Sequence, residues 1–253
     1  MFLSRRATQA EYSDAPGRSP AQVARDYRQL ARVNRLCFVT DPFQRVLVRW
    51  LGRDRCRNLS ILDLGAGDGS IGRTMTRWAA QQGWNWRVTN LDVNPMALRL
   101  NPGGDNVVGS VLALPFAPES FDAVIASQMT HHLTRDEDVI LHFREAWRVT
   151  RDALLLNDLH RNPILLGLVW LIVRCARLSP EMRADGMISV RRGWRLSEWQ
   201  TLAERAGISG ARVWLYCGAR IILQARKTAC GRFPVTLPTQ GRGSCFIPEP
   251  AGK

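Results

Sequence analysis

The stretch ILDLGAGDGSIG, residues Ile61 to Gly72, decides how this chain folds. A short apolar run ends at Asp63, and glycines follow at alternate positions before a helical pattern begins. Glycine is needed where the backbone takes a positive φ or where a ligand lies against the main chain. The order predicts a strand, a tight turn and a helix whose free N–H groups and positive dipole end face the turn.

The spacing of the glycines separates two kinds of nucleotide-binding fold. A dinucleotide-binding fingerprint needs G-x-G-x-x-G and an acid about 20 residues further on. Here the glycines run G-x-G-x-G after Asp63, and the next apolar strand, Trp86 to Leu91, is followed by Asp92. An acid at that place can accept hydrogen bonds from both hydroxyls of a ribose. A glycine turn that only packs a helix on a sheet is the structural alternative.

These two motifs resemble those of the class I S-adenosylmethionine-dependent methyltransferases. The family's first motif looks like residues 63–69, DLGAGDG, and its second like residues 91–94, LDVN. The resemblance implies S-adenosylmethionine as the cofactor, with Asp63 at its amino-acid end and Asp92 at its ribose. The other cofactor-binding positions that it implies are Gly65, Ala66, Gly67, Gly69, Val93, Ser110, Val111 and Ser127.

The third motif of the family has one departure in this chain. Residues 109–116, GSVLALPF, match it in frame. The family usually has an acid directly after the glycine, which bonds the adenine amino group, and this chain has Ser110. A serine hydroxyl or a main-chain group would have to make that bond. The departure concerns the affinity for adenine and not the fold.

Strand and helix patterns alternate along the chain, as a parallel sheet requires. The predicted strands are 59–64, 86–92, 106–109, 121–126 and 153–157. Residues 213–217 and 220–225, joined through Gly218, predict an antiparallel hairpin. The expected fold class is α/β: a Rossmann-like, seven-stranded, mostly parallel sheet with helices on both faces and an antiparallel C-terminal hairpin.

The chain divides into four predicted segments: a flexible arm (1–18), N-terminal helices (19–57), a methyltransferase domain with a helical lid insertion at about 160–195 (58–227) and a disordered tail (228–253). The insertion holds the most apolar stretch, Pro163 to Leu178, which is too short to span a bilayer because that takes about 20 residues. It predicts a buried helix or a lid over an apolar substrate, with transient membrane-surface contact as the alternative. Residues 179–195 read as a basic loop with a turn at Asp185-Gly186.

Composition limits the classes of partner. The 253 residues carry a formal charge of +13, but the basic residues are almost all arginine and are spread along the chain without a basic run. This pattern favours codon bias over a nucleic-acid surface, although the positive field would attract anionic partners. The six cysteines show no metal-ligand spacing, so no metal site is expected. We expect a cytoplasmic protein, because no secretory signal is visible.

Candidate catalytic residues follow the fourth and fifth predicted strands, because ligands of open α/β sheets bind outside the carboxyl ends of the strands. Three of the four histidines lie there, His131, His132 and His160. Histidine titrates near neutral pH and can take a proton from a phenol or an enol. We expect His160 as the general base with Asp158 as its orienting partner, and His131 as the rival. A role in tying down the loop is the structural alternative for the histidine pair.

Missing motifs narrow the acceptor. Residues 126–129, ASQM, stand where amino-methyltransferases acting on adenine, cytosine or glutamine have an Asn/Asp-Pro-Pro-Tyr-like motif, and no Pro-Cys pair exists for cytosine-C5 chemistry. Over about residues 58–226 the chain resembles most the ubiquinone/menaquinone-biosynthesis-like branch. That resemblance implies O- or C-methylation of a small, hydrophobic, phenolic, quinone-like or polyketide-like acceptor in small-molecule biosynthesis. An RNA-modifying methyltransferase and a non-catalytic cofactor-binding protein remain alternatives, and the oligomeric state stays open.

Overall fold

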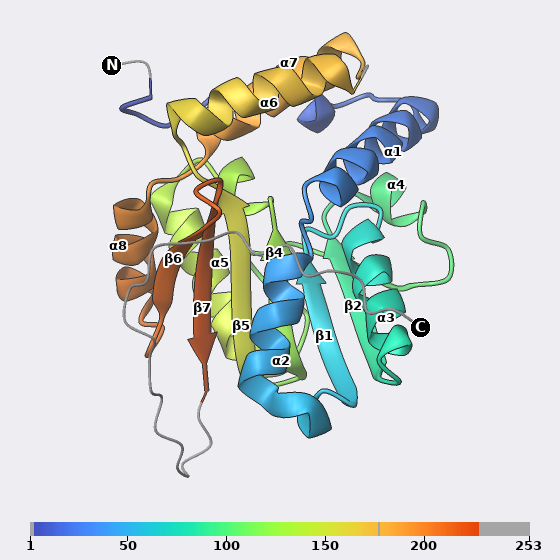
Figure 1. Ribbon diagram of the computed structural model, residues 1–253, viewed down its shortest axis with the longest axis vertical. Helices are drawn as coiled ribbons and strands as arrows, with labels where there is room; N and C mark the ends of the chain where they lie inside the picture. The colour runs from blue at the N-terminus through green and yellow to red at the C-terminus, as the bar shows by residue number, and fades with distance from the viewer. Residues whose placement is uncertain (1–2, 177, 228–253) are drawn as a thin grey trace, which may run out of the picture.

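One seven-stranded sheet organises the computed structural model, which describes residues 3–176 and 178–227 (Figure 1). The strands lie in the order β3-β2-β1-β4-β5-β7-β6. Strands β1 to β5 run parallel, and β7 is antiparallel to both β5 and β6. The predicted fold class is therefore confirmed. The strands are β1 (Asn58–Leu64), β2 (Asn85–Asp92), β3 (Asp105–Val108), β4 (Phe121–Ser127), β5 (Thr150–Leu159), β6 (Arg212–Tyr216) and β7 (Arg220–Arg226).

Helices cover both faces of the sheet because alternate strand residues point to opposite sides. Ala123 and Ile125 belong to the core under α2 and α3, whereas Val124 and Ala126 belong to the core under α5 and α8. The apolar runs of the central strands thus supply two cores at once. The helices are α1 (Pro20–Leu36), α2 (Asp41–Arg55), α3 (Ser70–Gln81), α4 (Pro95–Leu98), α5 (Asp136–Val149), α6 (Pro163–Cys175), α7 (Pro180–Arg192) and α8 (Leu196–Ala206).

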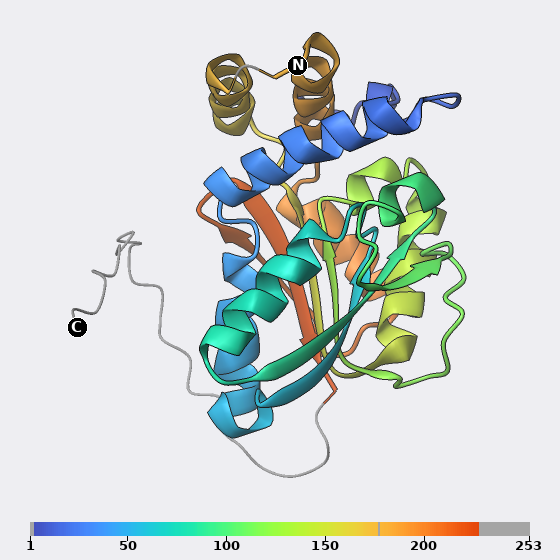
Figure 2. The same cartoon turned by 90° about the vertical axis from the view of Figure 1, so that its right-hand side faces the viewer.

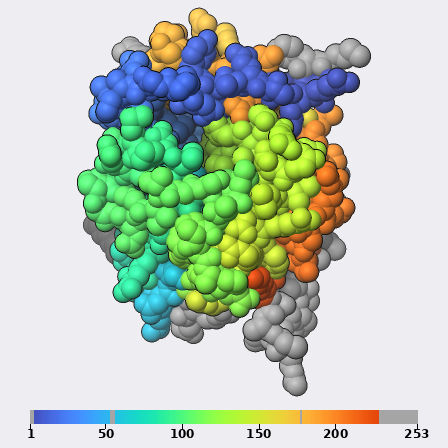
Figure 3. Space-filling model, turned by 180° about the vertical axis from the view of Figure 1, so that it is seen from behind, coloured from blue at the N-terminus to red at the C-terminus, as the bar shows by residue number. Residues whose placement is uncertain are grey.

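Helices α1, α6 and α7 lie beyond the carboxyl ends of the parallel strands (Figures 1 and 2). Helices α6 and α7 form a pair above this edge, and α1 crosses beneath the pair (Figures 1 and 2). From behind, the blue N-terminal segment and α1 form a band across the top of the molecule (Figure 3). Any ligand at this edge of the sheet therefore lies under α1, α6 and α7.

The predicted basic loop at residues 179–195 is a helix, α7, over most of its length. Ser179 caps it by accepting the N–H of Met182, and Pro180 occupies its first turn. The turn signal at Asp185-Gly186 is overridden by packing, because Gly186 lies inside the helix where an added Cβ would be 3.1 Å from Val173 of α6. The glycine allows α6 and α7 to approach closely.

The predicted flexible arm differs from the structure over residues 3–18. The main-chain N–H of Ala7 donates to the carbonyl of Arg191, and the carboxylate of Asp185 accepts the N–H groups of Tyr12 and Ser13 at the short helix η1 (Tyr12–Asp14). The arm is thus fixed on α7. The tail predicted at 228–253 lies outside the described residues. Within the described part of the chain, no helix is both long and apolar enough to cross a membrane.

Candidate functional site

The glycine turn between β1 and α3 has the conformation that its sequence predicts. Gly65, Gly67 and Gly69 all have positive φ, at 67°, 57° and 66°. The N–H groups of Gly65 and Ala66 donate to the carbonyl of Leu91, at 2.8 and 3.0 Å, which ties the turn to the end of β2. The turn and the end of the neighbouring strand therefore form one rigid unit.

Gly67→Ala is expected to lower the free energy of unfolding by about 1–2 kcal/mol, because a side chain at positive φ is strained. The added Cβ would also lie 2.4 Å from the ring of Tyr27. Urea unfolding measures the change. Gly167→Ala in α6 is the matched control, since nothing lies within 4 Å of its added Cβ. That control should gain about 0.5–1 kcal/mol from its helical position, and a Gly67→Ala variant as stable as wild type would contradict the strained turn.

Two carboxylates stand at the tips of adjacent strands. Asp63 lies near the end of β1 and is buried, with 1% of its surface exposed. Its Oδ2 has no hydrogen-bond partner among the described residues. Burial, followed by the charges of Asp92 and Asp68, raises the pKa of Asp63 to about 8. Asp92 accepts the N–H of Gly67 at 2.7 Å and that of Asn94 at 2.8 Å, and burial raises its pKa. An unpaired buried carboxylate is costly and calls for a cationic partner.

The remaining predicted cofactor positions surround the same edge. Val93 follows Asp92 and is 74% exposed, so a planar ring of a bound ligand could stack on its apolar side chain. Ser127 is buried at the end of β4, where its hydroxyl accepts a hydrogen bond from Asn157. The hydroxyl of Ser110 accepts the N–H of Leu112 at 3.1 Å, so it is engaged locally, and Val111 packs on the core.

Two side chains that the sequence did not single out lie on the glycine turn. An added Cβ at Gly65 would be 2.2 Å from Met129, and one at Gly67 would be 2.4 Å from Tyr27 of α1. Burial raises the pKa of the Tyr27 phenol, and the charges of Asp92 and Asp68 raise it further. Tyr27 therefore lies close to the carboxylates of Asp92 and Asp68. A ligand on the turn must displace Tyr27 and Met129 or lie beside them.

The loops after β4 and β5 meet at a buried histidine. Asp158 accepts the main-chain N–H of His131 at 2.8 Å and pairs with its Nδ1 at 2.7 Å. On the other side of the ring, Nε2 lies 3.3 Å from Oε1 of Glu11. All three side chains are buried. The predicted pairing of Asp158 with His160 is therefore not formed, and Asp158 holds His131 instead.

The charges of His131, Asp158 and Glu11 determine one another's protonation states. Burial disfavours the imidazolium, but the carboxylates of Asp158 and Glu11 outweigh it and raise the pKa of His131 to about 10. Burial likewise opposes ionisation of Asp158, but the charge of His131 and hydrogen bonds from N–H groups outweigh it and lower the pKa. His131 is therefore positively charged at neutral pH and cannot accept a proton from a substrate.

His132 belongs to a second set of contacts next to the first. Its Nδ1 lies 2.9 Å from Oδ2 of Asp14, and its Nε2 lies 3.9 Å from Oε2 of Glu11. Arg192 of α7 donates to the carbonyls of His131 and His132, at 3.0 and 2.8 Å. The N-terminal segment, the turn after β4 and α7 are joined here.

His160 lies just beyond β5, against the turn of the β6–β7 hairpin. Its Nδ1 is 3.0 Å from the carbonyl oxygen of Gly218 and 2.9 Å from the amide nitrogen of Asn162. When Nδ1 donates to that carbonyl, the other ring nitrogen is the acceptor. His160 is half-exposed and, unlike His131, pairs with no carboxylate in the described structure.

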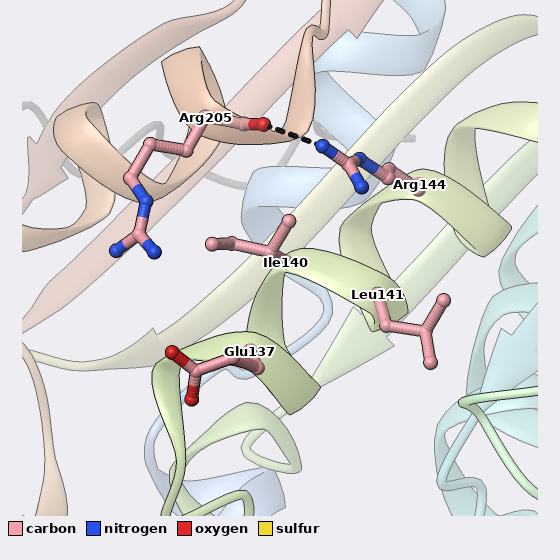
Figure 4. Close-up of a pocket in the computed structure, with 5 residues that line it drawn as sticks. All are labelled: Glu137, Ile140, Leu141, Arg144 and Arg205. Carbon is pink, nitrogen blue, oxygen red and sulfur yellow. Dashed lines mark hydrogen bonds between the residues drawn. The ribbon is translucent and has the colours of Figure 1, made fainter.

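A shallow pocket between α5 and α8 contains none of the predicted site residues (Figure 4). Arg144 donates there to the carbonyl of Arg205 at 3.0 Å, beside Glu137, Ile140 and Leu141. Its lining comes from the outer surface of these two helices and not from the loops that follow the strands. We assign the candidate site to the carboxyl edge of the sheet.

Residues 62–153 match the family model for a methyltransferase domain. The match runs from β1 into β5 and so includes the glycine turn, Asp92 and the turn after β4. No curated protein matches the chain in sequence. Over these residues the chain is similar to methyltransferase domains, and the match does not distinguish a quinone-biosynthesis branch.

Solved structures share the architecture. An S-adenosylmethionine-dependent methyltransferase from Aquifex aeolicus is 15% identical, with 83% of this chain and 98% of that chain covered and a TM-score of 0.54. The plantazolicin methyltransferase BpumL, in complex with S-adenosylhomocysteine, is 12% identical, with 86% and 92% covered and a TM-score of 0.63. Human N-acetylserotonin methyltransferase, in complex with S-adenosylmethionine, is 16% identical, with 83% and 56% covered and a TM-score of 0.57. The fold is that of S-adenosylmethionine-dependent methyltransferases.

Sequence reasoning missed the residues that the N-terminal segment contributes. Glu11, Asp14 and Tyr27 precede the residues that match the family model, yet all three reach the carboxyl edge of the sheet. A local signal existed for one of them, since Tyr27 lies on the apolar face of a well-capped helix. Nothing local distinguishes Glu11 and Asp14 from solvated acids.

Proposed function

We propose that this protein is an S-adenosylmethionine-dependent methyltransferase that methylates an oxygen or carbon atom of a small, apolar acceptor. The unpartnered carboxylate of Asp63, beside the glycine turn and on the strand next to that of Asp92, carries the proposal. An ammonium group beside Asp63 would restore its ionised form, and Asp92 is placed for a ribose. When bound, the cofactor supplies an electrophilic methyl group.

The protein's own residues would orient the acceptor and keep water away from it. Methyl transfer is an in-line displacement, so alignment of the acceptor contributes much of the rate. The acceptor would lie between the loops after β4 and β5 and beneath α6 and α7. His160 is the proposed general base, because His131 is already charged and held by two carboxylates.

The apolar character of the acceptor is inferred from α6. This helix covers the site and leaves large apolar side chains exposed, including Ile164 at 83%. The others are Leu168, Trp170 and Leu171. Such a surface favours an apolar acceptor of the phenolic, quinone-like or polyketide-like class, delivered from solution or from a membrane surface. We keep the quinone-biosynthesis-like branch as the proposed relationship.

A mass-spectrometric screen tests the function. The protein is incubated with S-adenosylmethionine and panels of phenols, quinones and polyketide-like acids, and products are searched for the mass of one added methyl group. A methylated product from one class supports the proposal. Calorimetry with S-adenosylmethionine and S-adenosylhomocysteine is the second measurement, and failure to bind either ligand would refute it.

His160→Ala is expected to lower kcat by about 100-fold, because general-base catalysis typically contributes that much or more. Cofactor affinity should stay unchanged, since His160 lies beyond β5 and away from the glycine turn. Turnover with an acceptor from the screen and calorimetry with S-adenosylhomocysteine separate the two effects. Wild-type kcat in the variant would remove His160 from the mechanism.

A further inference from the structure

The turn after β4 and the N-terminal segment bring two imidazoles and a carboxylate together in a way that methyl transfer does not require. One donor atom from each of Glu11, His131 and His132 lies within 4.8 Å of the other two. The Nε2 atoms of His131 and His132 face the two oxygens of Glu11, at 3.3 and 3.9 Å. We propose that these three side chains bind one divalent transition-metal ion of the zinc type.

Both histidines are oriented for metal binding by carboxylates on their far side. Asp158 lies 2.7 Å from Nδ1 of His131, and Asp14 lies 2.9 Å from Nδ1 of His132. With Nδ1–H donated in this way, each Nε2 points toward Glu11 and offers its lone pair to an ion there once it has released any proton. Metal-binding histidines commonly donate their other N–H to a carboxylate, which fixes the tautomer and raises the basicity of the ligand. Ser189 also donates to Oε1 of Glu11 at 2.8 Å and restrains it.

The spacing of the donor atoms suits a small tetrahedral ion. Ligands about 2.0–2.1 Å from a tetrahedral zinc ion are separated by about 3.4 Å. The 3.3 Å between Nε2 of His131 and Oε1 of Glu11 meets this condition without movement. The Nε2 of His132 lies 3.9 Å from the other oxygen of Glu11, Oε2, so its partly exposed ring must move closer for one ion to contact all three side chains. Without an ion, the proton of the charged His131 ring lies between its Nε2 and Glu11, and a bound metal ion would take the place of that proton.

The charge around the cluster favours a cation on balance. Three carboxylates, those of Glu11, Asp14 and Asp158, contact the two imidazoles. Arg192 is the opposing charge, 3.4 Å from Asp14 and 4.0 Å from Glu11, and its guanidinium is tied to the carbonyls of the histidine turn. Arg6 donates to the carbonyl of Leu133 at 2.9 Å rather than to a carboxylate.

The donor set selects the class of metal. Imidazole and carboxylate together suit zinc and its transition-metal neighbours, whereas magnesium and calcium prefer oxygen ligands alone. Three protein ligands leave a fourth position for water or an oxygen of the acceptor. That last role rests on the proposed methyl transfer, but metal binding itself does not.

Calorimetric titration with Zn²⁺ tests the site. The full chain is treated with a chelator, and its thiols are alkylated first because the chain has six cysteines. We expect one ion per chain, with binding weakened about 100-fold or more in Glu11→Gln and His132→Asn and about 10- to 100-fold in Asp14→Asn. Glu137→Gln, an exposed acid on α5, is the matched control and should bind as wild type does.

Absorption of the Co²⁺ derivative gives an independent readout, since a tetrahedral site of nitrogen and oxygen ligands produces intense visible bands without a thiolate band. Equal Zn²⁺ affinity in wild type, Glu11→Gln and Asp14→Asn would overturn the proposal, as would binding that disappears when the thiols are blocked. Asp14 is partly exposed, so Asp14→Asn keeps the test decisive if the buried variants fold poorly. A protein that binds Zn²⁺ but transfers no methyl group would refute the proposed function alone.

Discussion

Asp92→Ala is expected to weaken binding of S-adenosylhomocysteine by about a thousandfold. Hydrogen bonds to a charged group contribute about 1.5–3 kcal/mol each, and a ribose offers two hydroxyls. Losing both costs about 4 kcal/mol, which is close to a factor of 1,000 in affinity. The carboxylate also accepts the N–H of Gly67 at 2.7 Å, so the variant loosens the glycine turn as well.

Calorimetry measures this loss directly, and circular dichroism shows whether the variant is folded. Asp105→Ala is the matched control, because Asp105 is exposed at the start of the neighbouring strand β3. Its affinity should equal that of wild type. Asp92→Asn keeps an oxygen for the N–H of Gly67 but loses the charge, so we expect an intermediate affinity. Wild-type affinity in Asp92→Ala would mean that no ribose lies at the end of β2.

The central strands and the glycine turn were predictable because local sequence determines them. The apolar run before Asp63 can be buried only as a strand inside the sheet, and the glycines after it permit positive φ. The strand that ends at Asp92 then pairs in parallel with the first, with Leu64 opposite Leu91. Two adjacent strand tips therefore bring the glycine turn and both carboxylates together.

The contacts of the candidate catalytic residues were less predictable, because they depend on register and on distant residues. Parallel pairing places Ser127 of β4 opposite Asn157 of β5, so the turn after β4 lies directly over Asp158. Sequence proximity suggested His160 as the partner of Asp158, but the sheet brings His131 there instead. Glu11 reaches the same histidine from 120 positions earlier in the chain.

Helix α7 shows that secondary structure, too, can depend on residues that are distant in the sequence. Its Asp185-Gly186 pair is a turn signal in isolation. In the fold, the carboxylate of Asp185 accepts the N–H groups of Tyr12 and Ser13, and Gly186 packs against α6. Contacts with residues far away in the sequence convert a turn signal into the inner face of a helix.

Asp158→Ala is expected to lower the free energy of unfolding by about 3–5 kcal/mol at pH 7, because it removes one partner of a buried ion pair. His131 would keep only Glu11 as a charged partner, and its main-chain N–H would lose its acceptor. Urea unfolding of chelator-treated protein measures the loss. Asp105→Ala, which removes an exposed carboxylate, should stay within about 0.5 kcal/mol of wild type.

The pH dependence identifies the pair as the cause. The folded pKa of His131, about 10, lies above its ordinary value of 6.5, so its stabilisation is complete below about pH 6.5 and is lost as the pH rises toward 10. The pKa of Asp158 is lowered, so its contribution is present above the ordinary value of 3.8 and is lost as the pH falls further. Wild-type stability should therefore fall between about pH 7 and 10, and Asp158→Ala should flatten that fall because His131 then has a lower pKa. Parallel curves for wild type and variant would mean that Glu11 alone holds the charge on His131.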